Sequence, residues 1–167
     1  MRVKLPLLSM VLMLLIAAGS ANAQVKISGT AKCAKPEVQH SLNISGNSDQ
    51  AFSISQSKCT WSQPWTIAGI KGNEGEVLQS SEIKGDTITW HAVYVDTMEN
   101  GDRSTYDEHG SGTLKGGLLQ SGEEKWTLVA GTGKLKGYKG TGTCRGSGAP
   151  DGSSSWQCEG TLTPPKK

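Results

Sequence analysis

The chain has 167 residues, with 17 Lys and Arg against 15 Asp and Glu. Residues 1–23 have the pattern of an export signal, and removing Arg2 and Lys4 with it leaves the two signs equal. This balance argues against a nucleic-acid-binding protein, which shows a basic excess or stripe. Five tryptophans and a regular apolar alternation argue against a disordered chain and predict one domain with a packed core.

The N-terminal segment is predicted to be a cleaved signal peptide. Two positive charges precede the apolar run Leu5–Ala18, and Ala21-Asn22-Ala23 places small residues where a signal peptidase cleaves, before Gln24. The apolar run is shorter than the ~20 residues that span a bilayer as a helix, and no later stretch could span one. We therefore expect an exported protein, periplasmic or extracellular, without a membrane span.

Alternation of apolar and polar residues predicts strands along the rest of the chain. The expected strands are Val25–Ala31, Val38–Ile44, Ala51–Trp61, Glu76–Lys84, Thr87–Thr97, Arg103–Leu114, Glu124–Ala130, Leu135–Arg145 and Ser154–Leu162. Turns are expected at Gly46-Asn47, Gly72-Asn73, Gly85-Asp86, Asn100-Gly101, Ser121-Gly122 and Asp151-Gly152. This pattern predicts an all-β fold, an antiparallel barrel or sandwich, over residues 24–163, followed by a disordered tail over 164–167.

Four cysteines in an exported chain predict two disulfides, although four thiols allow three pairings. Cys144 and Cys158 lie symmetrically about the turn at Asp151, which places them opposite each other on a hairpin. Cys33 and Cys59 bracket another turn-like segment. The spacings do not fit a zinc site, so no metal is expected.

The hairpin at Asn100-Gly101 carries the candidate site. A two-residue loop would place Val95 opposite Tyr106 and bring His91 diagonal to Glu108 on the more apolar face. Inside a barrel, His91 and Glu108 could act as acid and base. Alternatively they form a satisfied polar pair at the barrel mouth, or they face water if a bulge shifts the register.

The aromatic residues have two interpretations. They are the bulk of the core, or they line a pocket for a flat ligand, with Trp61 and Trp65 beside the turn at Pro64 as the exposed candidates. The segment Gly131–Lys134 lacks the residues of a phosphate-binding loop and is interpreted as a hairpin turn. Gly137, Gly140 and Gly142 are expected to let a strand bend.

The segment Trp126–Gly140 resembles the Gly-Thr-Gly-x-aromatic-x-Gly segment of dirigent proteins and allene oxide cyclases. It is similar also to small exported bacterial proteins of unknown function thought to share that barrel. The resemblance covers about residues 87–164 and implies that the fold is a single antiparallel β-barrel of about eight strands. Leu135 replaces the aromatic residue of the plant enzymes, and no match to the catalytic pocket of the cyclase is present, so the resemblance implies no activity.

We interpret the sequence as a binding or accessory module for a small hydrophobic or phenolic ligand, rather than an enzyme, and expect no cofactor. The candidate ligand-binding residues are His91, Tyr106, Glu108 and Trp65. One alternative is an isomerase or cyclase acting on a hydrophobic substrate in the lumen. Another is a structural envelope protein without a ligand. The oligomeric state stays open.

Overall fold

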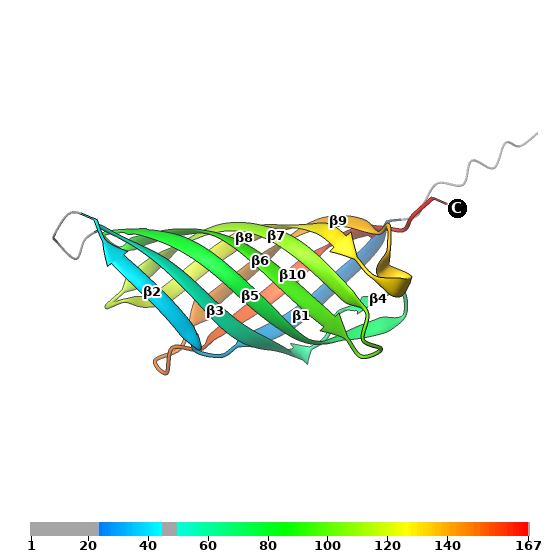
Figure 1. Cartoon of the computed structure of the whole chain (residues 1–167), viewed down its shortest axis with the longest axis horizontal. Coiled ribbons are helices and arrows are strands. Elements are labelled where there is room, and N and C mark those ends of the chain that lie inside the picture. Colours follow the sequence, from blue (N-terminus) through cyan, green and yellow to red (C-terminus); the bar gives the residue numbers. More distant parts are fainter. Residues whose placement is uncertain (1–23, 45–49, 167) are drawn as a thin grey trace, which may run out of the picture.

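The protein is all-β over the residues that the computed structural model describes, 24–44 and 50–166 (Figure 1). The expected signal segment and the Gly46-Asn47 turn lie outside these residues. The elements are β1 (Val25–Cys33), β2 (Val38–Asn43), β3 (Gln50–Gln63), β4 (Thr66–Ile67), β5 (Ile70–Lys84), β6 (Thr87–Met98), β7 (Arg103–Lys115), β8 (Leu118–Gly131), the 3-10 turn η1 (Gly133–Leu135), β9 (Lys139–Gly148) and β10 (Ser154–Thr163).

Eight of the strands close into an antiparallel barrel. The order is β1-β10-β9-β8-β7-β6-β5-β3, and β3 pairs back onto β1 through Cys33 and Cys59. The two additional strands are short: β2 pairs with β3 beyond the end of β1, and β4 pairs with β5. In Figure 1, β2 lies at one end of the tube, and β4 lies with η1 and the C-terminal tail at the other. The predicted barrel of about eight antiparallel strands is confirmed.

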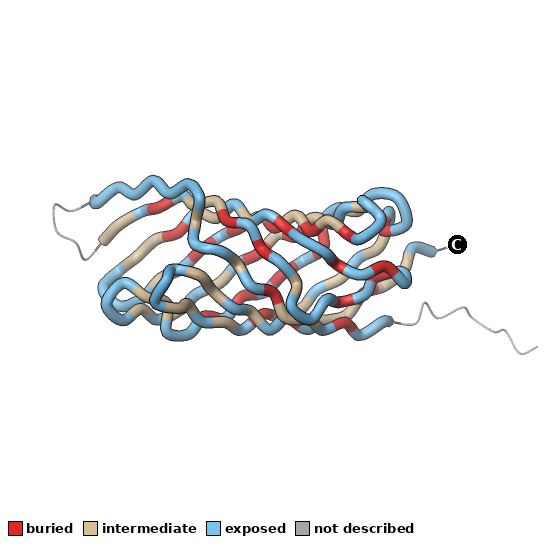
Figure 2. The backbone as a smooth tube through the Cα atoms, turned by 90° about the horizontal axis from the view of Figure 1, so that it is seen from below, coloured by how far each residue is buried: buried red, intermediate tan, exposed pale blue. Residues whose placement is uncertain are grey.

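The wall alternates between buried and exposed residues, as expected when one face of each strand points into the lumen. Figure 2 shows this alternation along the strands. Glycines at inward positions make room for large rings from other strands. A Cβ at Gly142 or Gly160 would lie 2.3 Å from Trp126, and one at Gly110 would lie 2.2 Å from Trp90. Aromatic side chains packed against bare backbone therefore occupy part of the lumen.

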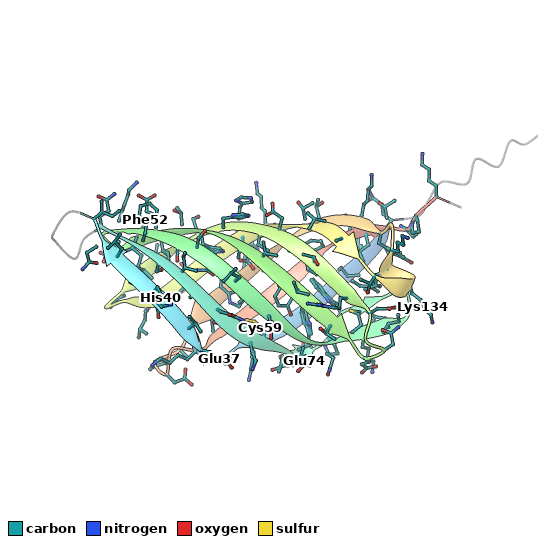
Figure 3. All side chains as sticks on the ribbon, viewed as in Figure 1. Glu37, His40, Phe52, Cys59, Glu74 and Lys134 are labelled. Atoms are coloured by element: carbon teal, nitrogen blue, oxygen red, sulfur yellow. A yellow bond between two sulfur atoms is a disulfide. The ribbon has the colours of Figure 1, made fainter. Side chains whose placement is uncertain are left out.

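Two disulfides link adjacent strands of the wall, as the sequence predicted. Cys33 is bonded to Cys59 across β1 and β3, and Cys144 to Cys158 across β9 and β10. Figure 3 labels Cys59 in the lower wall of the barrel. Disulfides of this kind form in oxidising compartments, so the protein is suited to such an environment.

Replacing both Cys144 and Cys158 by alanine is expected to lower the free energy of unfolding by about 3 kcal/mol. The reason is that the disulfide closes a short loop and so restricts the conformations of the unfolded chain. The two cysteines are 14 residues apart. Urea denaturation of the oxidised wild type and the double variant measures the effect. An unchanged denaturation midpoint would contradict this expectation.

Two turns and three strand starts differ from the sequence prediction. β5 begins at Ile70 and not at Glu76, and β8 begins at Leu118 and not at Glu124. The β7–β8 turn is made by Gly116 and Gly117, which both have positive φ, and not by Ser121-Gly122, which lies within β8. Gly72-Asn73 is an irregularity within β5, and the chain turns earlier, before Ile70. The expected strand from Leu135 begins at Lys139 instead, because η1 occupies Gly133–Leu135.

Candidate functional site

The lumen is closed at the end that carries β4 and η1. Leu135 of η1, Met98 of β6 and Ile67 of β4 are at most 1% exposed and pack together with Leu162 of β10 in the core. η1 therefore acts as a plug, which the sequence prediction of a continuous strand missed. Among the described residues, the space inside the barrel lies toward the opposite end, near β2 and the turn at Gly116-Gly117.

That space is a cavity of about 560 Å³. Small polar side chains of β3 and β5 line one side, among them Ser53, Ser57 and Ser81. Aromatic rings line another, from Trp90 and Tyr94 of β6 and Trp156 of β10. The cavity exists where the small serine side chains leave space beside the rings. It therefore has one polar and one aromatic side.

Two carboxyl groups from neighbouring strands lie in this cavity. Glu108 of β7 and Glu124 of β8 both line it and are each 8% exposed. In the β7–β8 ladder, Glu124 is opposite Gly110, which is two residues from Glu108, so the two side chains are diagonal neighbours on the inner face. The indole Nε1 of Trp90 donates a hydrogen bond of 2.9 Å to Oε2 of Glu124.

Burial changes the acidity of both carboxyls. Loss of hydration raises the pKa of Glu124 to about 7, although the hydrogen bond from Trp90 acts in the opposite direction. The pKa of Glu108 is raised well above its ordinary value, first by burial and then by repulsion from Glu124. Both shifts favour the protonated form, in which a carboxyl can donate as well as accept a hydrogen bond.

A third carboxyl, Asp96, lies deeper and is fully buried. Its two oxygens each accept a 2.9 Å hydrogen bond, one from Nε1 of Trp61 and one from Nε1 of Trp65. Burial raises the pKa of Asp96 to about 6, against the lowering effect of the two indoles. The bonds fix both tryptophan rings at the base of the cavity.

Trp65 is therefore not the exposed rim residue that the sequence suggested. It is 3% exposed and packs against Tyr106 and Trp126, with ring centroids 5.3 and 5.7 Å away. Trp61 and Trp65 both line the cavity. The sequence around Pro64 gives no sign that Trp65 is held inside the barrel, because the residue that holds it, Asp96, is distant in the chain.

The predicted register of the β6–β7 hairpin is wrong by one residue. Tyr94, not Val95, is opposite Tyr106, and Ala92 is opposite Glu108. Tyr106 and Glu108 point inward as expected, but His91 points outward, where its Nε2 lies 2.6 Å from Asp107 Oδ1. The acid–base pair of His91 and Glu108 does not exist, because the two side chains lie on opposite sides of the wall.

Sequence reasoning also missed the inward residues of β6. The face assigned to the exterior, with Trp90, Tyr94 and Asp96, is the interior one. Tyr94 lines the cavity, and its buried hydroxyl has no hydrogen-bond partner among the described residues. Trp90 and Tyr94 alternate with less bulky residues on this face, and this pattern could have indicated that the face is buried.

No protein-family model matches the chain, and no curated protein is found to match it. Among the described residues, no helix is long and apolar enough to cross a membrane. We therefore define the class of this protein by its fold, a closed eight-stranded barrel with a lumen accessible at one end.

Proposed function

We propose that the protein is an exported binding module that holds one small, largely apolar ligand in the accessible half of the barrel. The cavity of about 560 Å³ carries this proposal. Its volume falls within the range of small-molecule sites, and its aromatic side with a few polar groups has the usual composition of such sites. The two disulfides support export, as does the signal-like pattern of residues 1–23.

The polar groups of the cavity restrict the chemistry of the ligand. The charged residues among those that line it are Lys35 and Asp86, which are exposed, and the buried Glu108 and Glu124. A phenol, alcohol or amine attached to an aromatic or aliphatic body would place its donor at the carboxyl pair and its apolar part against Trp90 and Trp156.

A second candidate function, an isomerase or cyclase, has one observation in its favour. A carboxyl with a raised pKa inside an apolar cavity, such as Glu108, suits a general acid. The base would then have to be the Glu124 carboxylate, since His91 lies outside the lumen. The resemblance to the allene oxide cyclase and dirigent barrel stays a proposal about ancestry and adds no catalytic residue.

The test uses N-phenyl-1-naphthylamine, a neutral aromatic amine whose fluorescence rises in apolar sites. We expect saturable binding with a Kd in the micromolar range. Ser57→Phe, which fills the cavity from β3, is expected to weaken binding by at least about tenfold. Ser80→Phe is the matched control, because Ser80 is exposed on β5 and does not line the cavity.

Two outcomes would contradict the proposal. Equal binding to both serine variants would place the probe outside the lumen. Absence of binding to the wild type, together with an unaccompanied protein mass in native mass spectrometry, would favour a structural role without a ligand.

A further inference from the structure

We propose that His91, Asp107 and His109 on the outer wall form a binding site for Zn²⁺ or a similar divalent ion of the first transition row. His91 is directly opposite His109 in the β6–β7 ladder, and Asp107 is two residues before His109 on the same outer face. The site is independent of the lumen, because Glu108, the residue between Asp107 and His109, points inward.

The three side chains already converge. Nε2 of His91 lies 2.6 Å from Oδ1 of Asp107, and Nε2 of His109 lies 3.2 Å from its Oδ2. The imidazole rings are stacked with centroids 4.4 Å apart and planes 11° apart, so both direct Nε2 toward the same carboxylate. One ligand atom from each residue lies within 4.8 Å of the other two.

This arrangement matches the preferences of zinc. Imidazole nitrogen and carboxylate oxygen bind Zn²⁺ at about 2.0–2.2 Å, which places the ligand atoms of a tetrahedral site about 3.3 Å apart. The three side chains are 39% to 65% exposed, so they are free to make the small rotations required. Three protein ligands would leave the fourth position to water or to a ligand of the ion.

The distribution of histidine supports the assignment. The chain contains three histidines, and two of them meet at this one cross-strand pair. In the part of the chain that the structure describes, no other group of three potential ligands converges in this way. The remaining histidine, His40, is exposed on β2 and pairs with Ile54 of β3 (Figure 3). It provides a control within the same molecule.

The experiment is titration of the mature, disulfide-bonded protein with ZnCl₂ in an isothermal calorimeter, using protein made without a histidine tag. We expect one Zn²⁺ per chain. His91→Ala and Asp107→Asn are each expected to weaken binding by at least about tenfold, since loss of a direct ligand costs no less than loss of a supporting group. His40→Ala is expected to leave the Kd within about twofold of the wild type.

Circular dichroism of each variant verifies that the barrel is retained. Absence of Zn²⁺ binding to the wild type would overturn the proposal. Binding that survives His91→Ala unchanged, or that is lost in His40→Ala, would overturn it as well, because the ion would then occupy another site. A Co²⁺-loaded wild type should show the visible absorption of a tetrahedral nitrogen–oxygen site, and His91→Ala should abolish it.

Discussion

Gly142→Ala is expected to destabilise the barrel by about 3 kcal/mol or more, as a methyl group is forced into a filled interior. A Cβ at Gly142 would lie 2.0 Å from the backbone oxygen of Glu159 and 2.3 Å from the Trp126 ring. Trp126 is 2% exposed and has rings of Trp65 and Tyr106 against it, so it cannot move aside. The midpoint of thermal or urea unfolding measures the loss.

Gly148→Ala is the matched control, because it changes an inward glycine of the same strand. At Gly148 the nearest atoms to a Cβ are 3.3 Å away, near the accessible end of the lumen. We expect this variant to lose less than about 1 kcal/mol. Equal losses at both positions would show that glycine flexibility in β9, rather than space for Trp126, is what the barrel requires.

Local patterning was sufficient to predict the strands and the all-β class, and the resemblance to the dirigent-like barrel then favoured a barrel over a sandwich. Alternation along a strand indicates that one of its faces is buried, and the expected strands correspond to nine of the ten observed. The pairing of Cys144 with Cys158 also followed, because the symmetric spacing about Asp151 fixes the register of that hairpin. Both inferences use only interactions between near neighbours in the chain.

The candidate site was harder to predict, because it depends on the length of one loop. The β6–β7 loop has three residues, Glu99 to Gly101, since the Met98 N–H donates to the carbonyl of Asp102. Gly101 has a φ of 85°, as in three-residue hairpins with a glycine bulge. The carboxylate of Asp102 accepts the N–H of Lys134, so η1 stabilises this longer loop. One extra residue shifts the pairing and exchanges the faces of β6 relative to β7.

The long-range partners of buried polar groups could not be predicted at all. Trp61 and Trp65 donate to Asp96, which is more than 30 residues away in the sequence. Likewise, Trp90 of β6 donates to Glu124 of β8 over Gly110 of the intervening strand β7. No periodicity in one chain indicates which buried donor will meet which acceptor, because those contacts arise only when the barrel closes.

The free energy of unfolding is expected to be highest near pH 4–5 and to fall by about 3 kcal/mol or more toward pH 8. Burial raises the pKa of Glu124 from 4.5 to about 7, that of Asp96 from 3.8 to about 6, and that of Glu108 in the same direction. Between the unfolded and folded pKa values the folded protein binds more protons, so stability is present below the unfolded pKa and is lost as the pH rises. The shift of Glu124 alone corresponds to about 3 kcal/mol.

Glu124→Gln tests the origin of this pH dependence. Glutamine keeps an oxygen that accepts the Trp90 N–H and removes the charge, which also relieves the repulsion on Glu108. We expect this variant to be more stable than the wild type by about 2 kcal/mol at pH 8, with a flatter pH profile measured by urea denaturation. Glu123→Gln is the matched control, because Glu123 is exposed on the outer face and makes only a surface ion pair with Arg145. If Glu124→Gln were less stable than the wild type at pH 8, the buried carboxylate would be stabilised by its surroundings. The proposed position of the ligand's donor at the carboxyl pair would then lose its support.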